Sequence, residues 1–126
     1  MAQLSGRRVL VVEDEVLVAN TLEAVLRHAG CEVLGPISSL DKAVAAARHE
    51  EIDVALLDLN LAGNKVYPVA EVLLKREIPF VLMTGNRGEA LPSGYEGRPV
   101  MFKPFPVESM LDVLRKMLER ARSNLS

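Results

Sequence analysis

Short apolar runs alternate along this chain with segments in which apolar residues recur every three or four positions. The runs predict β-strands at residues 8–12, 31–35, 53–57, 79–83 and 99–102. The helical spacing predicts helices at residues 18–29, 39–50, 66–73 and 107–121. Ser38 and Asp41 form a capping-box pattern before the second helix. Strands that alternate with helices favour an α/β fold with a doubly wound, five-stranded parallel sheet of strand order 2-1-3-4-5.

The segment between the fourth and fifth predicted strands has no helical spacing of comparable strength. Its helix-breaking residues are Gly85, Gly88, Pro92, Gly94 and Gly97. They leave room for at most a short helix, so we expect a loop or a shortened, irregular fourth helix there.

Length and composition limit what the chain can be. It has 126 residues, of which 49% are hydrophobic and 25% are charged, and this predicts one domain over residues 1–126 without an output domain. A net charge of −2 gives no reason to expect direct binding to nucleic acid. No apolar run approaches membrane-spanning length, and no segment has the pattern of a signal peptide. We therefore expect a cytoplasmic protein without membrane contacts, in which the single Cys31 is a small buried hydrophobe.

Polar residues follow four of the predicted strands. Asp58 ends the apolar run 54–57, and Glu13 and Asp14 follow the first strand. Thr84 follows the fourth strand and Lys103 the fifth. Asp58 taken alone could simply open a turn or cap a helix. In a parallel sheet, however, these strand ends meet at one edge, so we expect the polar side chains to converge.

Crowded carboxylates repel one another unless a cation lies among them, and oxygen ligands without His or Cys suit Mg²⁺. Asp14, Asp58 and a backbone carbonyl near Asn60 could supply three ligands. Lys103 and the hydroxyl of Thr84 could bind phosphoryl oxygens. Because an Asp carboxylate can accept a phosphoryl group, this edge is a candidate site of phosphoryl transfer.

These residues resemble the receiver domains of bacterial two-component response regulators, a family with the flavodoxin-like strand order. The resemblance implies that Glu13, Asp14, Asp58 and Asn60 bind Mg²⁺, that Asp58 is the phosphoacceptor, and that Thr84 and Lys103 bind the phosphoryl group. It also implies a cis peptide bond before Pro104. Asn60 and Asn86 resemble the positions that tune dephosphorylation.

The same resemblance implies how the domain works. A histidine kinase or phosphotransfer protein would donate the phosphoryl group, and a downstream protein partner would receive the signal. The receiver would catalyse only its own phosphorylation and dephosphorylation, so it would not be an enzyme in the usual sense.

Two features depart from the usual receiver pattern. Val100 stands where receivers usually carry Tyr or Phe, and the Gly-rich segment replaces a well-formed fourth helix. Residues 79–85, PFVLMTG, are similar to the Pro-Phe-x-Phe-Ala-Thr-Gly motif of a subfamily of single-domain receivers, with Leu82 and Met83 in place of Phe and Ala. We therefore expect the switch at Thr84 and Val100 to act through residues 85–97 rather than through an aromatic ring.

Three alternatives have different sequence requirements. A phosphatase with an aspartate nucleophile would need a second carboxylate where Asn60 stands. A flavin-binding module would need a loop rich in Gly, Ser and Thr after the first strand, where Glu13 and Asp14 would repel phosphate. A degenerate receiver that binds a partner without phosphorylation would not need every charged residue of the site.

Overall fold

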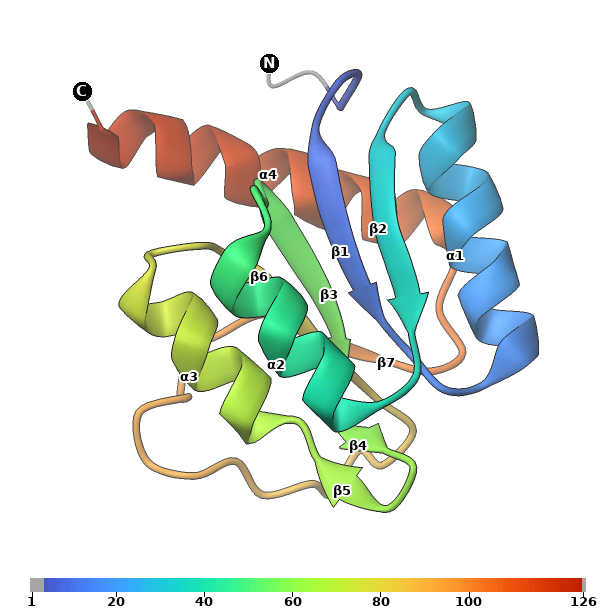
Figure 1. The fold of residues 1–126 in the computed structure, drawn as a ribbon, viewed down its shortest axis with the longest axis vertical. Helices are drawn as coiled ribbons and strands as arrows, with labels where there is room; N and C mark the ends of the chain where they lie inside the picture. Colours follow the sequence, from blue (N-terminus) through green and yellow to red (C-terminus); the bar gives the residue numbers. More distant parts are fainter. Residues whose placement is uncertain (1–3, 126) are drawn as a thin grey trace.

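A central parallel sheet confirms the predicted topology (Figure 1). The computed structural model describes the backbone of residues 4–125 and side chains as far as residue 121. The strands of the sheet are β1 (Arg8–Val12), β2 (Glu32–Ile37), β3 (Val54–Asp58), β6 (Phe80–Thr84) and β7 (Val100–Phe102). Their order, β2-β1-β3-β6-β7, is the expected 2-1-3-4-5 order of the five main strands.

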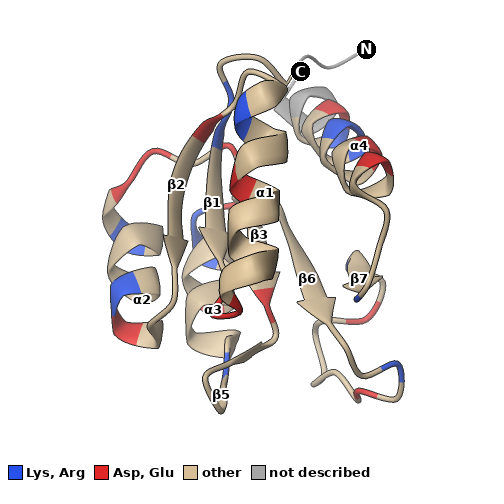
Figure 2. Ribbon diagram, turned by 90° about the vertical axis from the view of Figure 1, so that its right-hand side faces the viewer, with Lys and Arg blue, Asp and Glu red and all other residues tan. Residues whose placement is uncertain are grey.

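Helices cover both faces of the sheet (Figure 1 and Figure 2). They are α1 (Val16–His28), α2 (Leu40–His49), α3 (Tyr67–Lys75) and α4 (Val107–Leu125). Val9 and Val11 of β1 pack in the core with α1 and α4, whereas Leu10 and Val12 pack with α2 and α3. Alternate residues of a strand point to opposite faces, and this explains why consecutive residues of β1, β3 and β6 are apolar, except for the polar strand-end residues Arg8, Asp58 and Thr84.

The second strand and the second helix differ in detail from the prediction. Strand β2 continues to Ile37, two residues beyond the predicted end at Gly35. The chain passes Gly35 with a φ of 107° and a cis peptide bond before Pro36, and the register with β1 shifts at this point. Helix α2 is capped by Ser39, whose hydroxyl accepts a hydrogen bond from the N–H of Lys42 at 3.3 Å. The cap thus lies one residue after the predicted Ser38, and it is not a capping box, because Lys42 has no side-chain acceptor to complete one.

A small hairpin follows β3 where the sequence predicted only a loop. Strands β4 (Asn60–Leu61) and β5 (Asn64–Lys65) pair antiparallel, with Asn60 opposite Lys65. The turn between them has positive φ values at Ala62 (48°) and Gly63 (85°). Such turns match the twist of the flanking strands, so the hairpin holds Lys65 across from Asn60.

Between Thr84 and Val100, a stretch that the structure describes completely, the chain contains no helix. The prediction of a loop is confirmed there, and the shortened fourth helix is absent. Leu91 and Tyr95 of this segment pack in the core on the α2 and α3 face. The hydroxyl of Tyr95 donates a hydrogen bond of 2.6 Å to Glu71 of α3, and its ring lies 5.2 Å from that of Tyr67. The side chain of Tyr95 thus holds the loop against α3.

The described helices include none that is both long enough and apolar enough to cross a membrane.

Candidate functional site

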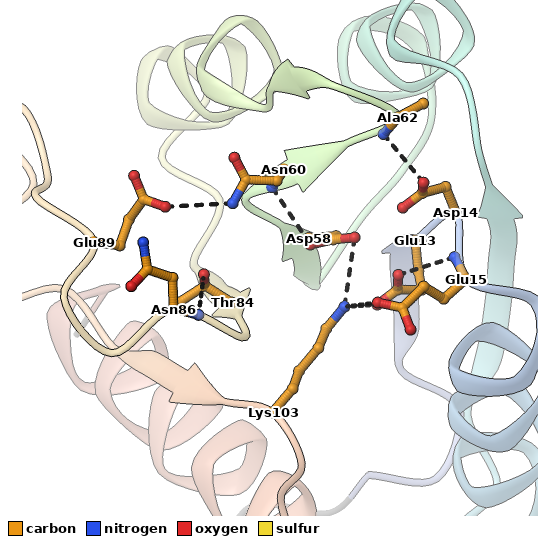
Figure 3. Close-up of polar contacts among 10 residues, drawn as sticks. All are labelled: Glu13, Asp14, Glu15, Asp58, Asn60, Ala62, Thr84, Asn86, Glu89 and Lys103. Atoms are coloured by element: carbon orange, nitrogen blue, oxygen red, sulfur yellow. Dashed lines mark hydrogen bonds and ion pairs between the residues drawn. The ribbon is translucent and has the colours of Figure 1, made fainter.

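The carboxyl ends of β1, β3, β6 and β7 bring the predicted polar residues together (Figure 3). Asp58 is the last residue of β3, and Thr84 is the last residue of β6. The backbone N–H of Lys103, just after β7, donates to the carbonyl of Thr84 at 2.8 Å. The backbone hydrogen bonds of the sheet therefore fix where these side chains start. The peptide bond between Lys103 and Pro104 is cis, as expected.

Three carboxylates crowd this edge. Glu13, Asp14 and Asp58 each offer an oxygen within 4.8 Å of the others. Glu13 and Asp58 are buried, and Asp14 is half-buried. Backbone N–H groups hold two of them, since that of Glu15 donates to Glu13 Oε2 and that of Ala62 donates to Asp14 Oδ2, both at 3.1 Å. The cluster concentrates negative charge where little water can screen it.

Lys103 partly balances this charge. Its Nζ lies 2.7 Å from Glu13 Oε1, 3.3 Å from Glu15 Oε1 and 3.4 Å from Asp58 Oδ2. Burial opposes the charged form of Lys103, but the carboxylates of Glu13, Asp58 and Glu15 outweigh it and keep its pKa above the usual value. Glu15 was not predicted to belong to the site, although it belongs to the same acidic run as Glu13 and Asp14.

Asp58 resists ionisation in this environment. Burial is the largest cause, followed by the neighbouring carboxylates of Glu13 and Asp14, and together they raise its pKa to about 8 despite the opposing charge of Lys103. Glu13 Oε1 is buried, and its contact with Lys103 Nζ at 2.7 Å is an ion pair without hydrogen-bond geometry. A hard divalent cation would relieve the repulsion and would find only oxygen donors here. The residues present therefore fit Mg²⁺, as the sequence predicted.

A comparison of the whole chain with known families agrees with this geometry. Residues 9–115 match the response regulator receiver domain. The chain belongs to this family.

Solved structures and sequence relatives agree with the assignment. The receiver is similar to SdrG from Sphingomonas melonis Fr1, with 36% identity over 94% of this chain and 99% of that one, and a TM-score of 0.77. It shares its fold with the receiver domain of the sensor histidine kinase PA1611 from Pseudomonas aeruginosa PAO1, at 22% identity, 91% and 99% coverage and a TM-score of 0.76. That protein has a magnesium ion coordinated in its active-site cleft.

Longer proteins also contain a similar region. The uncharacterized transcriptional regulatory protein YbdJ of Bacillus subtilis strain 168 is 28% identical over 120 residues, which is 92% of this chain but 52% of YbdJ. The receiver thus spans about half the length of such curated relatives. Neither these comparisons nor the structure bears on the finer likeness of residues 79–85 to the single-domain subfamily.

Thr84 ends β6, and its side chain stabilises the turn that follows. Thr84 is buried, and its Oγ1 accepts a hydrogen bond from the N–H of Asn86 at 3.1 Å. The side chain of Asn86 in turn accepts from the N–H of Gly88 at 3.0 Å. Asn86 is therefore close to the site, but its side chain stabilises the turn.

Val100, the second predicted switch position, is the first residue of β7 and lies two residues before the strand end beside Thr84. It pairs with Leu82, whereas Thr84 pairs with Phe102. Val100 is half-buried and packs in the core on the α2 and α3 face. Phe102 is half-buried, and the guanidinium of Arg87 lies 4.9 Å from the centre of its ring.

Asn60 lies at the rim of the site and is held on several sides. Its N–H donates to Asp58 Oδ1 at 3.4 Å, and its side-chain amide contacts Lys65 and Glu89. Hydrogen bonds from Lys65 and from Asn60 lower the pKa of Glu89. No pattern in the sequence indicated Lys65 or Glu89, because both depend on the hairpin and on the path of the loop.

Proposed function

We propose that this receiver accepts a phosphoryl group on Asp58 from the phosphohistidine of a kinase or phosphotransfer protein, and passes the signal to a protein partner by a change in conformation. The observation that supports it most is the position of Asp58, buried at the end of β3 beside Glu13, Asp14 and Lys103. A carboxylate kept among groups of both charges is suited to gain and lose a phosphoryl group.

The chain's own residues have distinct roles in the transfer. An oxygen of Asp58 forms a bond to phosphorus as the phosphorus–nitrogen bond of the donor breaks. Lys103 can turn from Glu13 toward a phosphoryl oxygen, because its Nζ already lies 3.4 Å from Asp58 Oδ2. Thr84 can donate its hydroxyl proton to another phosphoryl oxygen while its Oγ1 still accepts from Asn86. Mg²⁺ held by Glu13, Asp14, Asp58 and the backbone carbonyl of Asn60 would neutralise charge on the phosphoryl group.

The reaction ends with one phosphoryl group per chain, so the receiver is not a turnover enzyme. We propose that Asn60, whose N–H donates to Asp58, and Asn86, whose N–H donates to Thr84, influence the attack of water on the acyl phosphate. We place the reaction in the cytoplasm, with which the free thiol of Cys31 is compatible. Against a small phosphomonoester, the protein should release no phosphate beyond one equivalent.

Labelling with small phosphoryl donors tests the proposal. The protein is incubated with acetyl phosphate or phosphoramidate, and with a phosphorylated phosphotransfer protein, with Mg²⁺ or with EDTA. We expect an acid-stable, base-labile adduct that forms only with Mg²⁺, because the metal offsets repulsion between the carboxylates and the incoming phosphate.

Two variants locate the adduct. Asp58→Asn should take up no label, whereas Asp112→Asn, which changes an exposed carboxylate on α4, should behave like the wild type. Label on Asp58→Asn at the wild-type level would refute the proposal. A folded wild-type protein that takes no label from any donor would instead point to a module that binds its partner without phosphorylation.

A further inference from the structure

Asn60, Lys65 and Glu89 form a closed set of contacts at the rim of the phosphoacceptor site, which we call the Asn60 latch. Figure 3 shows the contact between Asn60 and Glu89. The Nδ2 of Asn60 donates to Glu89 Oε1 at 3.3 Å, and its Oδ1 accepts from Lys65 Nζ. Lys65 Nζ also lies 3.0 Å from Glu89 Oε2. Both ends of the Asn60 amide are therefore engaged, and its two partners hold each other.

The residues of the latch come from the hairpin that follows β3 and from the loop that follows β6, and both segments begin next to the site. Asn60 lies two residues after Asp58, and the hairpin of β4 and β5 places Lys65 directly opposite it. Glu89 comes from the loop after β6, where its N–H donates to the carbonyl of Asn86 at 3.1 Å. Its side chain is only 14% exposed, so it is packed against the rim. The latch thus ties the loop after Thr84 to the hairpin after Asp58.

The latch limits the hydrogen bonds that the side-chain amide of Asn60 can make to water. The latch uses one N–H and one lone pair of the amide and fixes the plane of the group, so the N–H and the lone pair that remain cannot turn freely toward a water molecule at the phosphoryl group. Hydrolysis of the acyl phosphate needs such a water: its oxygen bonds to phosphorus, the bond from phosphorus to Asp58 breaks, and inorganic phosphate keeps the water's protons. The Asp58 carboxylate is then restored.

We propose that Lys65 and Glu89 are positioning residues that restrain the Asn60 amide and thereby lengthen the life of the acyl phosphate on Asp58. The inference rests on the proposed function, because it concerns the decay of the phosphorylated form. Lys65 and Glu89 act through Asn60 and need not touch the phosphoryl group.

Decay of the acyl phosphate tests the latch. Glu89→Gln and Lys65→Met are each phosphorylated with acetyl phosphate and Mg²⁺, freed of donor, and followed by loss of label. We expect both variants to lose phosphate about three- to tenfold faster than the wild type, which is the effect of losing one hydrogen bond. Lys65→Met removes the donor to Asn60 Oδ1, and Glu89→Gln removes the charge that holds Lys65 in place. Glu96→Gln is the matched control, because it removes an exposed carboxylate from the same loop away from Asn60, and its decay should match the wild type.

Two further variants separate the latch from a general effect of charge or stability. The double variant Lys65→Glu with Glu89→Lys restores an ion pair of reversed polarity, in which the amide can flip, and it should bring the decay rate back toward the wild type. In an Asn60→Ala background, Glu89→Gln should change the decay no further. Thermal unfolding of every variant shows whether its fold is intact.

The outcomes distinguish this inference from the proposed function. Opposite effects of Glu89→Gln and Lys65→Met would mean that the two charges act directly on the phosphoryl group, and would overturn the latch. Decay rates equal to the wild type in both variants would do the same while leaving Asp58 as the acceptor. A wild-type protein that takes no phosphate would remove both proposals together.

Discussion

At the scale of single residues, the carboxylates of the site outnumber the cations that could balance them. Lys103 is the cation nearest to Glu13 and Asp58 among the described residues, and Glu13 is almost fully buried. Removing one partner of a buried ion pair leaves the other charge unsatisfied. Without Mg²⁺, Lys103→Met should therefore lower the free energy of unfolding by about 2–4 kcal/mol, measured by urea denaturation in EDTA. Mg²⁺ should stabilise this variant more than it stabilises the wild type.

The control for this residue is Lys75→Met, which removes an exposed lysine at the end of α3. Surface changes of this kind usually shift the free energy of unfolding by less than about 0.5 kcal/mol. Equal stability of the two lysine variants in EDTA would show that Glu13 does not depend on Lys103.

At the scale of elements, residues 85–99 form a loop, where the sequence predicted a loop or a shortened, irregular fourth helix. The hydrogen bond from Tyr95 to Glu71 and the contact between the rings of Tyr95 and Tyr67 hold this loop against α3. Tyr95→Phe keeps the ring and loses the hydrogen bond, so it should cost about 0.5–1.5 kcal/mol of stability. Amide hydrogen exchange should become faster within the loop and stay unchanged in α4. Tyr67→Phe, which leaves the bond from Tyr95 to Glu71 in place, is the matched variant.

The same loop is where we expect the signal to leave the site. Thr84 is bonded to Asn86, so a movement of Thr84 toward a phosphoryl group would pull on the start of the loop. Phosphorylation should therefore change amide exchange within residues 85–97. Val100 has no ring that could turn inward, which is why the loop is the stronger candidate. Changed protection around Asp58 with none in the loop would exclude it as the switch.

At the scale of the whole molecule, we expect metal binding to be coupled to folding, because the proposed ligands Glu13, Asp14 and Asp58 come from separate parts of the chain and meet only in the folded state. Mg²⁺ at a hundred times its dissociation constant should stabilise the protein by about 2.7 kcal/mol and raise the melting temperature by several degrees. Asp14→Asn should lose most of this shift, whereas Thr84→Ala should keep it. Equal shifts in the two variants, measured by calorimetry, would count against Asp14 as a ligand.

Much of the fold and of the site followed from the sequence because the relevant signals are local. The run of buried residues before Asp58 marks a central strand, and the apolar stripe through Met110 and Leu114 marks the last helix. Asp58, Thr84 and Lys103 each end or follow a strand, and parallel strands present those ends at one edge. Their convergence could thus be predicted before any contact was known.

Other features were decided by the tertiary structure alone. The hairpin turns on Ala62 in a left-handed conformation, where an Asn-Gly or Asp-Gly pair would have been the recognisable signal. Glu89 meets Lys65 across 24 residues, and Tyr95 meets Glu71 across the same distance in sequence. Such contacts leave no periodic pattern, because they depend on how an irregular loop crosses a surface built from other elements. The sequence by itself therefore determined the sheet and the acidic site, and only the folded chain decided what surrounds and restrains that site.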